Sequence, residues 1–134
     1  VDLPDDIVEK IEASTKVATA EEYFSSTRME RENSFAKQLE NYENILSNIS
    51  MSDEQKRFAQ EEITKINNTQ NAITIAENLI KLKGFKDVVI LVNGDSINIV
   101  VMAEELDDAA ITQIQNIAST ELKVDSSNLH IRNL

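Results

Sequence analysis

The hydrophobic pattern of this chain changes its period at Gly84, and this change limits the possible folds strongly. Before Gly84, large apolar residues recur every three or four positions, which indicates amphipathic helices. After Gly84, the stretches 87–92 and 96–102 are rich in Val and Ile, which is typical of strands. Helices followed by strands favour the α+β class, in which helices pack on a sheet in two layers.

The region before Gly84 is expected to begin with a helical hairpin. The first helix covers 21–48, and the large apolar side chains along it and directly after it follow one face: Phe35, Leu39, Tyr42, Leu46 and Ile49. Only a few residues connect it to the next helix, so the two helices should pack antiparallel. We therefore interpret the apolar stripe as packing against the second helix, and a coiled-coil seam is the alternative.

The second helix is expected over 53–83. Ser52 and Gln55 have the spacing of a capping box at its start. Gly84 stands where a left-handed C-terminal cap belongs. Polar residues interrupt the apolar stripe of this helix, so it should be bent or locally weakened near 67–69.

The region after Gly84 is expected to contain three strands and one helix. Asn93-Gly94 is a strong hairpin signal, and Asp107 has the position of a helix N-cap. The predicted elements are a hairpin of strands 87–92 and 96–102, a helix over 108–121 and a last strand over 129–132.

The apolar content of the strands predicts their order in the sheet. Every residue of Val88–Val92 is apolar, and a strand that is apolar on both faces suits the centre of a sheet. The expected spatial order is therefore 2-1-3, with 96–102 and 129–132 at the two edges. The helical segments 72–83 and 108–121 should pack on one face of this three-stranded sheet.

The composition argues against several classes of function. The 134 residues include 13 Lys and Arg but 24 Asp and Glu, and the net charge of −11 disfavours nucleic acids and anionic membranes. Cysteine is absent and there are only two glycines, which excludes thiolate sites and glycine-rich phosphate loops. The single histidine, His130, could be a metal ligand or general base, but its place beside Arg132 favours a surface or interface residue. We therefore expect no catalytic residue, cofactor, metal or small-molecule substrate.

Two groups of residues are candidates for a protein contact. Tyr23, Phe24 and Met29 are large apolar side chains on a segment rich in Arg and Glu, where little core remains to receive them. The other group is the last strand, which is expected at a sheet edge with little chain after it: Leu129, His130, Ile131 and Arg132. We expect a partner at this edge and its flanking helical surface, and self-assembly through helix faces against a neighbour's sheet.

Residues 1–20 are weakly patterned and are expected to form a flexible leader with at most a short helix. A segment that folds on contact with a partner is the alternative. The chain begins with Val1, and its apolar runs are shorter than the roughly 20 residues that span a bilayer. Any membrane anchor would therefore precede Val1, and 21–134 is expected to be a single domain.

Several runs of residues resemble the stage III sporulation protein AH family, and together they cover about 21–132. The runs are Tyr23–Glu32, Ser34-Phe35, Gln38-Leu39, Ala76–Asp87, Asp95–Val101, Glu104-Glu105-Leu106 and Ile114-Gln115. None of them carries catalytic chemistry. The resemblance implies an ectodomain similar to the ring-building motif of secretion-system and flagellar basal-body ring proteins, which has an αββαβ order.

The resemblance also implies a non-enzymatic interaction domain. Members of this family are made in the mother cell, and an N-terminal membrane helix places the ectodomain between the mother-cell and forespore membranes. The implied partners are stage II sporulation protein Q, further copies in a ring, and other stage III sporulation proteins of a channel or feeding tube needed for engulfment. The alternatives are a small ligand-binding or acyl-phosphate-type α/β enzyme and a free coiled-coil adaptor.

Overall fold

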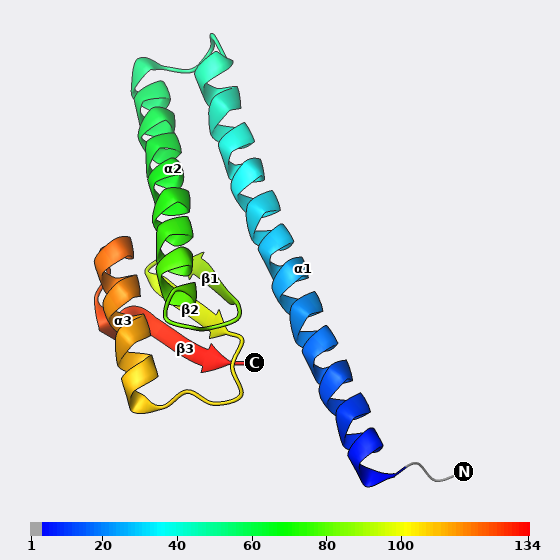
Figure 1. Ribbon diagram of the computed structural model, residues 1–134. Helices are drawn as coiled ribbons and strands as arrows, with labels where there is room; N and C mark the ends of the chain where they lie inside the picture. Colours follow the sequence, from blue (N-terminus) through cyan, green and yellow to red (C-terminus); the bar gives the residue numbers. More distant parts are fainter. Residues whose placement is uncertain (1–3) are drawn as a thin grey trace.

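The computed structural model describes residues 4–134, and the side chains of all of these except 16–18. The elements are α1 (Asp5–Ser47), α2 (Asp53–Lys81), β1 (Val88–Asn93), β2 (Ser96–Val101), α3 (Asp108–Leu122), a 3-10 turn (Ser126–Asn128) and β3 (Leu129–Asn133). The helices α1 and α2 form a long hairpin, and the start of α1 extends past the sheet (Figure 1). The predicted α+β class is confirmed, and so is the predicted order of the helices and strands along the chain.

The expectation of a flexible leader over 1–20 is wrong for residues 5–20, which form the first part of α1. Residues 1–3 lie outside the described part of the chain. Asp5 and Asp6 lie in the first turn, where carboxylates interact favourably with the helix dipole. Extending an existing helix by one residue costs much less free energy than nucleating a new helix. The helix that the apolar pattern predicts after residue 20 therefore continues into the weakly patterned segment before it.

The helix α2 begins as predicted and continues through its polar stretch. The Ser52 hydroxyl accepts from the Gln55 N–H (3.1 Å), and the Ser52 N–H donates to Gln55 Oε1 (2.9 Å). The weakening expected near 67–69 is not found, since α2 is one uninterrupted helix. Ile66 and Ile73 are buried on either side of the polar stretch, and Ile73 belongs to the main core. Gly84 has a φ of +105°, the left-handed conformation expected after the helix.

The predicted strand order is wrong, because the described sheet has the order β1-β2-β3. The central strand β2 pairs antiparallel with β1 and parallel with β3, and Ile99 lies between Ile90 and Ile131. The apolar strand β1 is at an edge. Val88, Val89 and Ile90 are nevertheless fully buried, because helices cover both faces of this strand.

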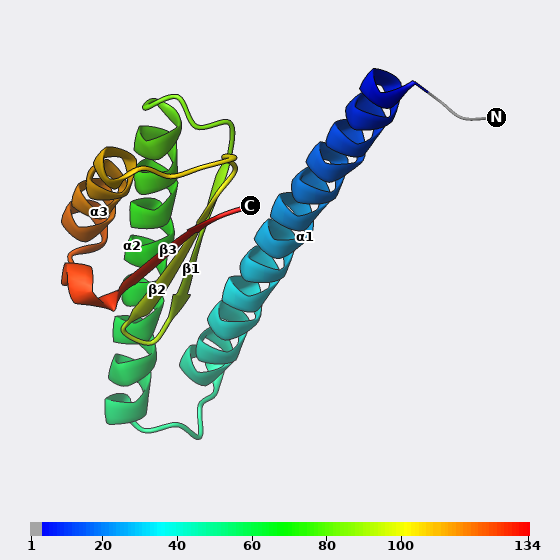
Figure 2. The ribbon, with the colours of Figure 1, turned by 90° about the horizontal axis from the view of Figure 1, so that it is seen from below.

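The sheet lies between two layers of helix (Figure 2). The main core fills the space between the sheet and the helices α2 and α3, as predicted. Its buried members are Ile73, Ala76, Ile80, Val88, Ile90, Ile97, Ile99, Val101, Ile114, Ala118 and Leu129. A second, smaller cluster lies under α1 on the opposite face and consists of Phe24, Val89 and Val100. The helix α1 thus covers part of the face that α2 and α3 leave open.

We expect Ile114→Ala and Ile90→Ala each to lower the free energy of unfolding by about 2–5 kcal/mol. Both side chains are fully buried in the main core, so truncation leaves a cavity there. Glu61→Ala, at an exposed position on α2, is the control and should change stability by less than about 0.5 kcal/mol. Urea denaturation measures all three variants, and equal midpoints would contradict the assignment of this core.

Candidate functional site

The two edges of the described sheet differ in how their backbone groups are satisfied. The Met102 N–H donates to the Asp87 carbonyl (2.8 Å), and Val88 pairs with Val101. In an antiparallel ladder, alternate residues direct their backbone groups toward the partner strand. The N–H and C=O groups of Val88 and Ile90 therefore point away from β2, toward the helices α1 and α2.

The outward groups of Ile90 are bound by a buried ion pair between α1 and α2. Arg31 Nη1 donates to the Ile90 carbonyl (3.0 Å) and to Glu77 Oε2 (2.8 Å), and the Ile90 N–H donates to the same carboxylate oxygen (2.9 Å). The side chains of Arg31 and Glu77 are only 8% and 10% exposed. Burial alone would lower the pKa of Arg31, but its hydrogen bonds and charge interactions with Glu77 and Glu32 outweigh burial and raise the pKa above its ordinary value.

The outward groups of Val88 are bound nearer the surface. Arg28 Nη2 donates to the Val88 carbonyl (3.0 Å) and to Asp87 Oδ1 (2.9 Å). The Val88 N–H donates to the same Asp87 oxygen (2.8 Å). We call these four charged side chains the edge clamp: Arg28, Arg31, Glu77 and Asp87. The edge clamp occupies all four outward backbone groups of Val88 and Ile90, so another strand cannot pair with them.

Along the outer edge of β3, no side chain of the described residues is hydrogen-bonded to the backbone groups that point away from β2. The Leu134 N–H donates to the Val101 carbonyl (2.9 Å), which fixes the alternation of the parallel β2–β3 ladder. His130 and Arg132 therefore direct their backbone groups toward β2, and Ile131 and Asn133 direct theirs outward. Unpaired N–H and C=O groups at a sheet edge are a template for an added strand.

Two of the predicted contact residues belong to the core instead. Phe24 is fully buried against Val89 and Val100, and Leu129 is 8% exposed. The prediction that Phe24 lies on an exposed contact surface is wrong. It assumed that little core remained near this part of α1, but α1 crosses the sheet and the second core cluster receives the ring.

The other predicted contact residues are at least partly accessible. His130 and Arg132 are exposed on β3, and Ile131 is half-buried. Arg132 Nη2 donates to the hydroxyl oxygen of the half-buried Tyr23 (3.1 Å), so the structure brings this α1 residue and the β3 edge together. Met29 is 63% exposed on α1 and belongs to neither core cluster.

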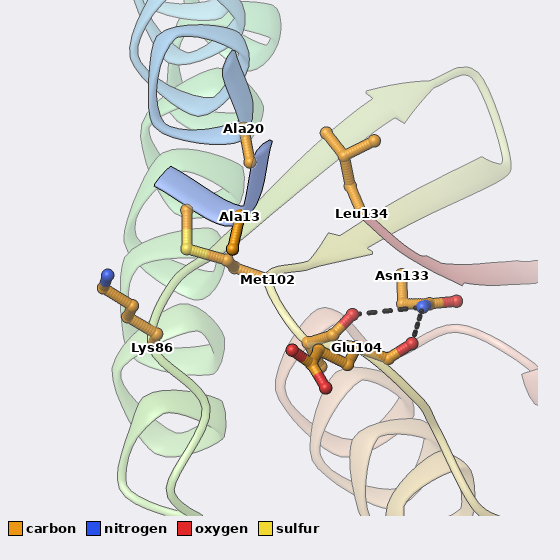
Figure 3. A pocket seen from close by; sticks show the side chains of 8 residues that line it. Ala13, Ala20, Lys86, Met102, Glu104, Asn133 and Leu134 are labelled. Atoms are coloured by element: carbon orange, nitrogen blue, oxygen red, sulfur yellow. Dashed lines mark hydrogen bonds between the residues drawn. The ribbon is translucent and has the colours of Figure 1, made fainter. Parts of the chain in front are cut away.

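A groove of about 290 Å³ adjoins the end of β3 (Figure 3). Its walls come from α1, from the segments that flank β1 and β2, and from the chain after Arg132: Ala13, Ala20, Lys86, Met102, Ala103, Glu104, Asn133 and Leu134. Asn133 Nδ2 donates to the carbonyls of Ala103 (3.0 Å) and Glu104 (2.9 Å) and so joins the groove's two strand ends. This groove was not predicted, because Ala13 fell within the expected leader.

Within 4–134, no group of three or more His, Cys, Asp or Glu side chains could hold a metal ion. No helix in the same range is both long enough and apolar enough to cross a membrane.

The chain is similar to known sporulation proteins. The SpoIIIAH-like protein family matches residues 4–131. Stage III sporulation protein AH of Bacillus subtilis (strain 168) is 25% identical over 103 residues, which are 77% of this chain and 47% of that protein, so this chain spans about half the length of that relative. A solved structure of the SpoIIQ-SpoIIIAH pore forming complex has a chain of the same fold, with a TM-score of 0.72, 23% identity, and coverage of 83% of this chain and 94% of that one. Because the family matches nearly the whole sequence, this chain belongs to the SpoIIIAH-like protein family.

Proposed function

We propose that this chain is a non-enzymatic interaction domain of a sporulation complex and that it binds stage II sporulation protein Q. Its family membership supports a role in sporulation, and a chain of the same fold occurs in a complex with SpoIIQ. The observation that carries the binding mode is the contrast between the clamped β1 edge and the uncovered β3 edge. A strand of the partner adds to β3 by pairing with the outward groups of Ile131 and Asn133.

We further propose that the domain lies in the space between the mother-cell and forespore membranes. There it assembles in rings with other copies and with other stage III channel proteins. A ring held by strand pairing alone would need two free sheet edges on each copy, and the edge clamp occupies one of them. Ring contacts therefore use helix faces against a neighbour's sheet.

A small ligand-binding enzyme is the less favoured function. His130 is exposed on β3, and the groove at the end of β3 is lined largely by small and apolar side chains. Such a groove offers space but no arrangement of nucleophile, base and acid. The site is therefore better suited to a protein contact than to a reaction.

The variant Ile131→Pro tests the binding mode, and it should weaken binding to the ectodomain of stage II sporulation protein Q by about fivefold to tenfold. Proline removes the outward N–H of Ile131, and one hydrogen bond contributes about 1 kcal/mol. The β2–β3 ladder should survive, since sheets tolerate proline where the N–H faces solvent. Calorimetric titration measures the dissociation constants of both proteins.

Ile131→Ala is the matched control, because it shortens the same half-buried side chain and keeps the N–H. It should bind the partner severalfold more tightly than Ile131→Pro does. If the proline variant binds as well as the alanine variant, strand addition at β3 is wrong. If the unaltered chain does not bind this ectodomain at all, the proposed partner is wrong.

A further inference from the structure

The β3 strand presents two chemically different rows of side chains. Leu129 and Ile131 point toward α2 and α3, where both contribute to the main core. His130 and Arg132 alternate with them and therefore lie on the opposite face, where α1 covers only part of the sheet. An added strand would meet an apolar row on one face and a basic row on the other.

Arg132 is held at this edge by a neutral hydrogen-bond partner. Its guanidinium donates to the hydroxyl oxygen of Tyr23 (3.1 Å), which holds it on the α1 side of the sheet. Arg28 and Arg31 each pair with a carboxylate at 2.9 Å or less, whereas Arg132 takes part in none of the ion pairs found in residues 4–134. An exposed guanidinium has donors left for a carboxylate from outside the chain.

The geometry points to an acidic strand as the occupant of the β3 edge: a segment that alternates carboxylates, opposite His130 and Arg132, with apolar residues opposite Ile131. This inference rests on the proposed docking at β3 and names the chemistry of the docked strand. Directly opposite side chains on neighbouring strands interact, and opposite charges in these positions stabilise the pair.

A second copy of this chain fits the same edge poorly. Antiparallel pairing of two β3 strands about Ile131 would put His130 of each copy opposite Arg132 of the other. This pairing places no carboxylate opposite Arg132, so its guanidinium gains no oppositely charged partner. The charges therefore select a different, acidic strand.

Two designed seven-residue peptides test this inference, one alternating Glu with Val and the other alternating Lys with Val. Each is titrated into the ¹⁵N-labelled chain while the amide signals of β3 are followed by NMR. The Glu peptide should shift the amides of Ile131 and Asn133 and bind about tenfold more tightly than the Lys peptide. Equal affinities, or no shift at β3 with either peptide, would overturn the inference.

The variant Arg132→Glu should reverse the preference between the two peptides. Arg57→Glu is the matched control, because it makes the same change of charge at an exposed position on α2. It should leave the preference for the Glu peptide in place, and equal effects of the two variants would overturn local pairing at β3.

Binding of the stage II sporulation protein Q ectodomain, measured beside the peptides, separates the two proposals. If that ectodomain binds but the peptides are not distinguished, the inference fails and the proposed function stands. If the Glu peptide is preferred but the ectodomain does not bind, the proposed partner fails and the acidic preference stands.

Discussion

Arg31→Ala is expected to lower the free energy of unfolding by about 3–5 kcal/mol, measured by urea denaturation. The loss is large because the substitution leaves the carboxylate of Glu77, a residue only 7% exposed, without its cation. The Ile90 carbonyl also loses its donor. The β1 edge is then partly open, so we also expect concentration-dependent self-association in size-exclusion chromatography.

A double variant separates two contributions of Arg31 and Glu77: their attraction to each other and their hydrogen bonds to the Ile90 backbone. Apolar residues can often replace both members of a buried ion pair at little cost. In Arg31→Met/Glu77→Leu, however, the N–H and C=O of Ile90 lose their partners, and each unsatisfied group costs about 1–3 kcal/mol. The double variant should therefore remain less stable than the unaltered chain. If the double variant were as stable as the unaltered chain, the ion pair would not be needed to satisfy the N–H and C=O of Ile90.

Features with a local physical cause were predictable from the sequence. The capping box of Ser52 and Gln55 needs only four consecutive residues, and the structure has both of its hydrogen bonds. Gly94 has a φ of +62°, so the hairpin turn also depends on the residue that marks it in the sequence. Asp107 accepts from the Ala110 N–H (2.7 Å) and begins α3 as expected.

The strand order was not predictable, because its cause is a contact between distant parts of the chain. The apolar run Val88–Val92 indicates burial on both faces, and we interpreted this as a central position. In the structure, Phe24 of α1 covers Val89, more than sixty residues away in the sequence. An edge strand can therefore be as apolar as a central strand when a helix packs over its second face.

The candidate site was predicted in part. The strand 129–132 does lie at a sheet edge, although the order used to place it there was wrong. The edge clamp was not predicted, because its ion pairs join α1 to residues more than forty positions away in the sequence. A usable signal was present: both arginines continue the stripe that contains Phe35, and Glu77 lies among the apolar positions of α2. When charged residues occur on two helix faces that are expected to be buried, their side chains must be paired. They then bind either each other or backbone groups that lack a partner in the sheet.

Phe24→Ala is expected to lower the free energy of unfolding by about 3–5 kcal/mol, measured by urea denaturation. The ring is fully buried against Val89 and Val100, and truncation leaves a cavity between α1 and the sheet. It also packs edge-to-face on Tyr23, with ring centroids 5.7 Å apart, so Tyr23 should lose its fixed position beside Arg132. Partner binding at the β3 edge should then weaken as well.

Met29→Ala is the matched control for this prediction, since it truncates a large apolar side chain that is 63% exposed on the same helix. It should change the free energy of unfolding by less than about 0.5 kcal/mol. If Phe24→Ala costs no more than Met29→Ala, α1 does not form a core with the sheet. The edge clamp and the packing of α1 against α2, which includes the edge-to-face contact of Tyr42 with Phe58, would then hold α1 in place. A double variant Phe24→Ala/Arg31→Ala whose loss differs from the sum of the two single losses would show that the ring and the clamp act together to position the helix beside β3.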